Sequence, residues 1–167
     1  MAAHVIESAD PRDPALALLM ARHEADCTAE TPPESCHRLN PADLATPDIA
    51  FFVGYSDGVP VSMGALKRLN ATEGELKSMH VLAEWRGQGL SRRMLDRLLE
   101  AARAQGLARV SLETGAQPIF APARGLYAAA GFQPCGPFGS YRDDPASRFM
   151  TLALGGPMPQ TGAAPAP

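Results

Sequence analysis

The feature that most constrains the fold of this chain is a loop with two glycines between a predicted strand and a predicted helix. The loop reads Trp85-Arg86-Gly87-Gln88-Gly89-Leu90-Ser91. Residues 75–82 before it are typical of a strand, and residues 91–105 after it carry apolar and charged side chains at helical spacing. Because the first N–H groups of a helix lack internal partners, the junction predicts an anion-binding site. Arg86 adds a guanidinium suited to phosphate.

Two common phosphate-binding loops do not fit this stretch. A P-loop requires Gly-Lys-Ser or Gly-Lys-Thr, and neither occurs in the chain. A dinucleotide-binding fingerprint requires a third glycine after Gly87 and Gly89, where this chain has Arg92. Both alternatives are therefore disfavoured.

The order of the predicted elements indicates one α+β domain over residues 1–154. Ser56-Asp57-Gly58 is a hairpin signal, so antiparallel strands precede the long second helix, and a mixed sheet with helices packed on it is expected. Residues 155–167 are almost wholly Gly, Pro, Ala, Thr and Gln, and a disordered tail is expected there. Strands are predicted over residues 3–8, 49–55, 59–69, 75–82, 109–114, 132–135 and 148–154, and helices over 14–27, 91–105 and about 122–131.

Charge and cysteine content narrow the compartment and the partners. Fifteen Lys and Arg against eighteen Asp and Glu give a net charge of −3 without a basic stripe, so nucleic acid is not an expected partner. No apolar run reaches membrane-spanning length, and no membrane association is expected. Cys27, Cys36 and Cys135 form no C-x-x-C pair, which favours reduced thiols in a cytoplasmic protein without a metal site.

The loop and its surroundings resemble the GNAT superfamily of acetyl-CoA-dependent N-acyltransferases. The family signature [QR]-x-x-G-x-[GA] is met by Arg86-Gly87-Gln88-Gly89-Leu90, with Ser91 in place of the last Gly or Ala. Residues 126–132, Leu-Tyr-Ala-Ala-Ala-Gly-Phe, are similar to the family's L-Y-x-x-x-G-F element. The resemblance covers about residues 49–154. It implies the GNAT fold, with a mostly antiparallel central sheet of about six or seven strands flanked by helices.

Four shorter runs, at residues 75–79, 112–115, 135–138 and 144–145, resemble a bacterial subgroup of uncharacterised GNAT proteins. One branch of that subgroup is linked by name to indole-acetic-acid metabolism. The resemblance implies acetyl-CoA as cosubstrate. Many relatives dimerise, so a homodimer is one expectation, although no pattern in the sequence identifies a dimer interface.

The resemblance also assigns residues to the cofactor. The backbone of Met79, His80 and Val81 is expected to lie against acetyl-CoA, with Met79 or its neighbour donating to the thioester oxygen. The pyrophosphate is expected on the loop, at Arg86, Gly87, Gln88, Gly89, Leu90 and Ser91.

Two residues are candidates for proton transfer. Glu75 lies eleven residues before Arg86, where some family members carry the general base. The alternative is a surface glutamate paired with Lys67 or Lys77. Tyr127 stands where the family places a tyrosine that protonates the departing CoA sulfur. The alternative interpretation is a core residue whose hydroxyl reaches solvent.

The acceptor is expected to be a small-molecule amine, acetylated directly in a ternary complex. Lys77 or Arg142 would suit an acceptor that carries a carboxylate. The alternatives are a protein or peptide acceptor, which requires an open groove, and a catalytically silent CoA-binding sensor. The connections at residues 31–35 and 136–147 decide between pocket and groove. Candidate acceptor-site residues are Lys77, Glu113, Phe120, Tyr141 and Arg142.

Overall fold

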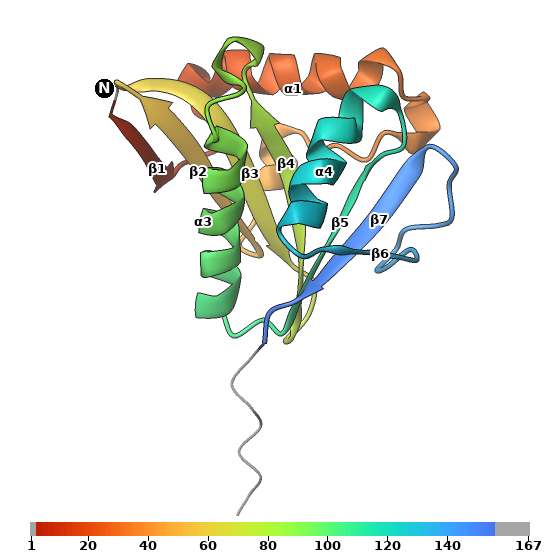
Figure 1. Ribbon diagram of the computed structural model, residues 1–167. Helices are drawn as coiled ribbons and strands as arrows, with labels where there is room; N and C mark the ends of the chain where they lie inside the picture. The colour runs from red at the N-terminus through yellow and green to blue at the C-terminus, as the bar shows by residue number, and fades with distance from the viewer. Residues whose placement is uncertain (1–2, 156–167) are drawn as a thin grey trace, which may run out of the picture.

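The computed structural model describes residues 3–155, which form a seven-stranded sheet with helices on both faces (Figure 1). The strand order is β1-β2-β3-β4-β5-β7-β6, and every neighbouring pair is antiparallel except β4 and β5. The mixed, mostly antiparallel sheet predicted from the sequence is thus confirmed. The strands are β1 (His4–Ser8), β2 (Ile49–Ser56), β3 (Val59–Arg68), β4 (Glu73–Val81), β5 (Arg109–Gly115), β6 (Gln133–Cys135) and β7 (Ser147–Ala153).

Four α-helices connect these strands. They are α1 (Ala17–Ala29), α2 (Pro41–Leu44), α3 (Leu90–Ala104) and α4 (Ala121–Ala129). None of the helices within residues 3–155 is long and apolar enough to cross a membrane. The tail predicted at residues 155–167 lies outside the described residues apart from Gly155.

Local signals explain where the first elements begin. The Asp13 carboxylate accepts a hydrogen bond from the Ala15 amide at 2.9 Å, and Pro14 opens a short 3₁₀ turn that leads into α1. In the hairpin between β2 and β3, Asp57 and Gly58 both have positive φ, at 48° and 81°. This left-handed pair is the turn that the Asp-Gly sequence favours.

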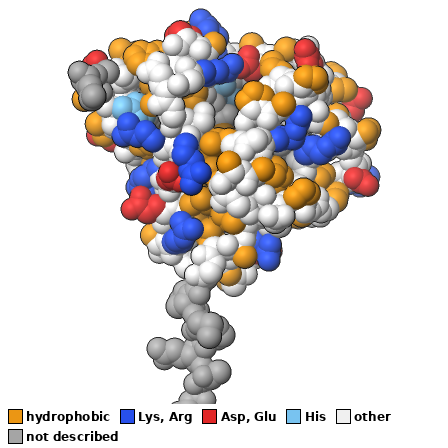
Figure 2. All heavy atoms as spheres, viewed as in Figure 1, with side chains coloured by type: hydrophobic (Ala, Val, Ile, Leu, Met, Phe, Trp, Pro, Cys, Tyr) orange, Lys and Arg blue, Asp and Glu red, His pale blue; other side chains and the backbone are white. Residues whose placement is uncertain are grey.

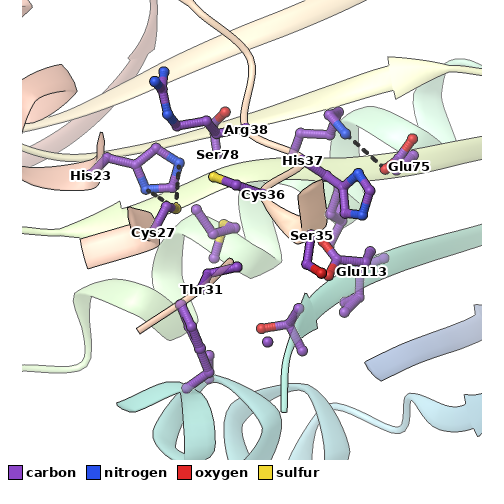
Figure 3. A pocket seen from close by; sticks show the side chains of 18 of the residues that line it. His23, Cys27, Thr31, Ser35, Cys36, His37, Arg38, Glu75, Ser78 and Glu113 are labelled. Carbon is purple, nitrogen blue, oxygen red and sulfur yellow. Dashed lines mark hydrogen bonds and ion pairs between the residues drawn. The ribbon is translucent and has the colours of Figure 1, made fainter. Parts of the chain in front are cut away.

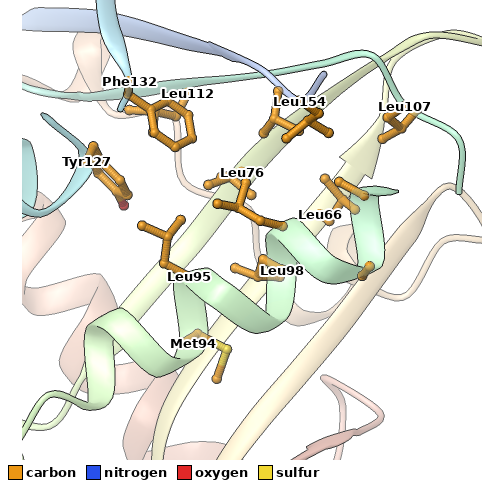
Figure 4. Close-up of a cluster of buried hydrophobic side chains, with 14 of the residues drawn as sticks. Leu66, Leu76, Met94, Leu95, Leu98, Leu107, Leu112, Tyr127, Phe132 and Leu154 are labelled. Atoms are coloured by element: carbon orange, nitrogen blue, oxygen red, sulfur yellow. The ribbon is translucent and has the colours of Figure 1, made fainter. Parts of the chain in front are cut away.

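Two apolar clusters hold the helices against opposite faces of the sheet, because successive side chains of a strand point to opposite sides. Phe52 and Leu66 point toward α3 and α4, whereas Phe51 and Ala65 point toward α1. Burying a leucine side chain contributes about 1.5–3 kcal/mol, so both layers are firmly attached. Figure 4 shows the larger cluster, with Leu66, Leu76, Met94, Leu95, Leu98, Leu107, Leu112, Tyr127, Phe132 and Leu154 labelled.

The sheet opens between its two parallel strands. Strand β4 pairs with β5 only over Glu73–Leu76, and beyond that point the two strands diverge (Figure 1). The edge of β4 that faces β5 therefore has no strand partner over its second half, and its backbone groups remain available to a ligand.

A β-bulge in β4 turns its second half. Met63 of β3 lies opposite His80 and Ala65 lies opposite Lys77, so Ser78 and Met79 together face a single residue. Ser78 adopts a φ of 55°, which is unusual for a side-chain-bearing residue. Because Met63 and Ala65 share the α1 face, the bulge brings Lys77 and His80 to that face as well.

Candidate active site

A cleft of about 420 Å³ lies where β4 and β5 diverge, between the first turn of α3 and α4. In Figure 2 apolar side chains gather between these helices, and Lys and Arg side chains lie over α3. Gln88 is the one predicted cofactor residue that does not line the cleft. The other eight line it, namely Met79, His80, Val81, Arg86, Gly87, Gly89, Leu90 and Ser91.

The loop before α3 has the backbone of an anion site. Gly87 and Gly89 adopt left-handed φ values of 78° and 76°, and a Cβ at either position would meet no atom within 4 Å. Gly89 is the N-cap of α3, and no side chain caps the helix. The Arg93 amide donates to the Gly89 carbonyl at 3.1 Å, so the amides ahead of it in the first turn are left for a ligand.

Arg86 links this loop to α1. Its Nη2 donates to the Asp26 carboxylate at 2.8 Å and its Nε donates to the Val81 carbonyl at 3.0 Å. The side chain remains 50% exposed, so part of the guanidinium still faces the cleft. The predicted phosphate donor thus forms a wall of the cleft while it is held by an aspartate of α1.

Two histidines fill the space between α1 and β4. The ring centroids of His23 and His80 are 5.4 Å apart, and His80 Nδ1 lies 3.9 Å from the Asp26 carboxylate. Burial lowers the pKa of each imidazole to about 4, although Asp26 opposes the shift. Both rings are therefore neutral at pH 7 and act as packing groups in the cleft wall.

An inner cavity of about 130 Å³ continues from the cleft and shares Met79, Phe120 and Tyr127 with it. Figure 3 shows the labelled side chains around this cavity, including Glu75 and Glu113. Four of the five predicted acceptor-site residues line it, namely Lys77, Glu113, Phe120 and Tyr141. Arg142 instead lines a separate outer hollow beyond Tyr141.

Glu75 is buried at the inner cavity, with 4% of its surface exposed. Its Oε1 accepts a hydrogen bond from Lys77 Nζ at 3.0 Å and another from the Tyr141 hydroxyl. The ion pair with Lys77 that the sequence offered as an alternative is present, but it lies in the cavity wall and not on the surface. Oε2 makes no hydrogen bond with any described residue, and this oxygen keeps some solvent-accessible surface.

Tyr127 and Glu113 border the same space from α4 and β5. The Tyr127 ring packs 5.7 Å from Phe132, and burial raises the pKa of Tyr127 above its usual range, so its phenol stays protonated. Its hydroxyl has no hydrogen-bond partner among the described residues, and the oxygen keeps some solvent-accessible surface. Burial also raises the pKa of Glu113, and the nearby charge of Glu75 adds to this shift.

Sequence reasoning expected the connection at residues 31–35 to shape the acceptor site, but it missed the wall that α1 supplies. His23 and Cys27 of α1, with Cys36 and His37 from the following connection, line the inner cavity. The spacing of His23 and Cys27 by one helical turn was the available signal. Burial raises the pKa of Cys27 to about 12, so this thiol is not a nucleophile at neutral pH.

Comparison with known proteins agrees with this geometry. Residues 16–132 match the family described as Acetyltransferase (GNAT) family. The uncharacterized N-acetyltransferase YsnE of Bacillus subtilis (strain 168) is 40% identical over 136 residues, which cover 81% of this chain and 90% of that protein. The IAA acetyltransferase of Azospirillum brasilense is 42% identical over 125 residues, covering 74% and 80%.

A solved structure extends the likeness to three dimensions. The crystal structure of the ribosomal-protein-S18-alanine N-acetyltransferase from Escherichia coli superposes on this chain with a TM-score of 0.72 at 21% sequence identity. The superposition covers 95% of this chain and 98% of that one. At that identity the likeness concerns the fold alone. The family resemblance of the loop and of residues 126–132 is confirmed, and this chain belongs to the acetyltransferase (GNAT) family.

Proposed function

We propose that this chain transfers the acetyl group of acetyl-CoA directly to the amine of a small molecule while both substrates are bound. The observation that carries the proposal is the junction of two spaces. The cleft beside the uncapped α3 terminus and the inner cavity beside Glu75 meet at Met79 and Tyr127. A thioester at this junction would have a proton acceptor on one side and a proton donor on the other.

The residues divide the proton transfers between them. Glu75 Oε2 accepts the proton of the acceptor amine as its nitrogen forms a bond to the thioester carbonyl carbon. A backbone N–H of β4 at or near Met79 donates to the oxygen that gains charge. Tyr127 gives its phenolic proton to the sulfur as the carbon–sulfur bond breaks, and solvent restores that proton. The chain itself forms no covalent bond to the acetyl group.

The form of the acceptor side supports a small molecule. The inner cavity has a volume of about 130 Å³, and its walls include side chains from residues 31–38 as well as Tyr141 and Ala146. A peptide would require an open groove past these walls. An enzyme whose name gives a ribosomal-protein alanine as acceptor shares this fold, so a protein acceptor is the second candidate.

A panel of acceptors tests the proposal. The purified protein is mixed with acetyl-CoA and either small primary amines or peptides with free amino groups, and release of the CoA thiol is followed. We expect release with small amines. Release with peptides alone would establish the protein acceptor, and a rise in Tm with acetyl-CoA but no release with any amine would establish a sensor.

A further inference from the structure

The connection between β6 and β7, residues 136–146, brings one tyrosine onto the carboxylate of Glu75. The Tyr141 ring lies 5.0 Å from that of His37, 5.1 Å from that of Phe138 and 5.5 Å from that of Phe149. Phe149 belongs to β7 and is itself buried, so the cluster anchors the connection to the sheet. Aromatic contacts on several sides leave the Tyr141 side chain little freedom to swing away.

The hydrogen bonds around Glu75 are asymmetric. Tyr141 and Lys77 both donate to Oε1, and Lys77 Nζ also donates to the Tyr141 hydroxyl at 2.9 Å. Burial raises the pKa of Tyr141, and the neighbouring Glu75 raises it further, so this phenol remains a donor across the working range of pH. One carboxylate oxygen is thus held by two donors while the other has none among the described residues.

We propose that Tyr141 is a positioning residue for acetyl transfer: with Lys77 it holds Oε1 of Glu75 and thereby presents Oε2 to the acceptor amine. The proposal rests on the function proposed above, in which Glu75 accepts the amine proton. Neither donor takes part in bond making. Their role is to fix the orientation of a carboxylate whose useful oxygen must lie within hydrogen-bond reach of the amine.

Tyr141 borders two spaces. The inner cavity and the outer hollow share Glu75, Lys77 and Tyr141 in their walls. Because Glu75 is buried, its carboxylate interacts more strongly with its two donors than an exposed carboxylate would, so the loss of either donor affects its orientation.

Replacing the hydroxyl alone tests this role. Tyr141→Phe keeps the ring and its aromatic contacts, and we expect kcat to fall about tenfold with an unchanged KM for acetyl-CoA. Tyr55→Phe is the matched control, since Tyr55 lies in β2 and lines neither the cleft nor the inner cavity. An unchanged kcat in Tyr141→Phe would overturn the proposal.

A second measurement does not depend on turnover. Carbon-13 NMR of glutamate labelled at the side-chain carboxyl detects the Glu75 carboxylate, whose resonance is identified by its absence in Glu75→Gln. At a fixed pH the chemical shift of this resonance should change in Tyr141→Phe, because one hydrogen bond to Oε1 is lost, and should not change in Tyr55→Phe. If no amine is acetylated by the unaltered protein, the proposed function fails, and the resonance still decides the contact: a changed chemical shift supports it and an unchanged one refutes it.

Discussion

The two sides of the candidate active site are built in different ways. The cofactor side takes the largest single part of its wall from one continuous stretch, residues 79–91, which supplies backbone amides and glycines. The acceptor side takes side chains from β4, β5, residues 31–38 and residues 136–146, which are far apart in the sequence. A binding site formed by the backbone of one turn can be predicted from the local sequence. A site made of side chains on separate connections depends on the whole fold.

The largest effect is expected on the acceptor side. Glu75→Gln removes the proposed proton acceptor but keeps the shape of the side chain, so we expect kcat to fall about 10²- to 10³-fold with acetyl-CoA affinity retained. Glu73→Gln, two residues earlier on the same strand and exposed, is the control and should leave kcat unchanged. If Glu75 were only the partner of Lys77, the substitution would lower Tm while kcat stayed near its original value.

Tyr127 lies where the two sides meet, and removing its hydroxyl should lower kcat nearly as much as removing the Glu75 carboxylate. Tyr127→Phe removes the proton donor for the departing sulfur without changing the ring, so kcat should fall about 10²-fold. Acetyl-CoA binding measured by calorimetry should stay within a factor of two or so, because the ring still packs against Phe132. A loss of binding that matches the loss of rate would assign Tyr127 to the cofactor side alone.

The contact between α1 and β4 predicts a pH dependence of stability. His23 and His80 have a pKa of about 4 in the folded chain, below the ordinary 6.5, so the unfolded chain binds more protons between these values. The free energy of unfolding should therefore fall as pH drops from 7 to 5, by about 2 kcal/mol for each imidazole. Urea unfolding of His23→Gln and His80→Gln at both pH values should show a shallower fall. An equal fall in these variants would locate the acid sensitivity elsewhere.

The smallest effect is expected at Arg86, where the backbone does most of the binding. Arg86→Ala should raise the Kd for acetyl-CoA about tenfold, because one charged donor is lost and the α3 amides remain. Asp26→Asn distinguishes two roles for Arg86. If the guanidinium binds phosphate, freeing it from Asp26 leaves acetyl-CoA affinity equal or higher. If Arg86 only ties the loop to α1, both variants weaken binding alike.

Much of the fold could be predicted because its signals are local. The Asp13-Pro14 start, the Asp57-Gly58 hairpin and the amphipathic face of α3 each specify a nearby backbone conformation, and the structure has all three. The bulge at Ser78 has no such signal, since the positive φ is imposed by pairing with β3.

The candidate site likewise has parts with a local sequence signal and parts that depend on the rest of the fold. The sequence indicated that the connection at residues 31–35 shapes the acceptor site, but not which side chains enter the cavity wall, because nothing near residues 31–38 specifies how this segment crosses the sheet. The bond between Tyr141 and Glu75 joins residues 66 positions apart, and it likewise depends on how the connections fold back over the sheet.

The most direct test of the account measures initial rates with acetyl-CoA and an accepted amine both varied, together with the intact mass of the protein during turnover. Direct transfer across a site in which both sides are occupied predicts intersecting lines in a double-reciprocal plot and no acetylated protein. Parallel lines with an acetyl group carried on the chain, at Cys36 for example, would contradict the account.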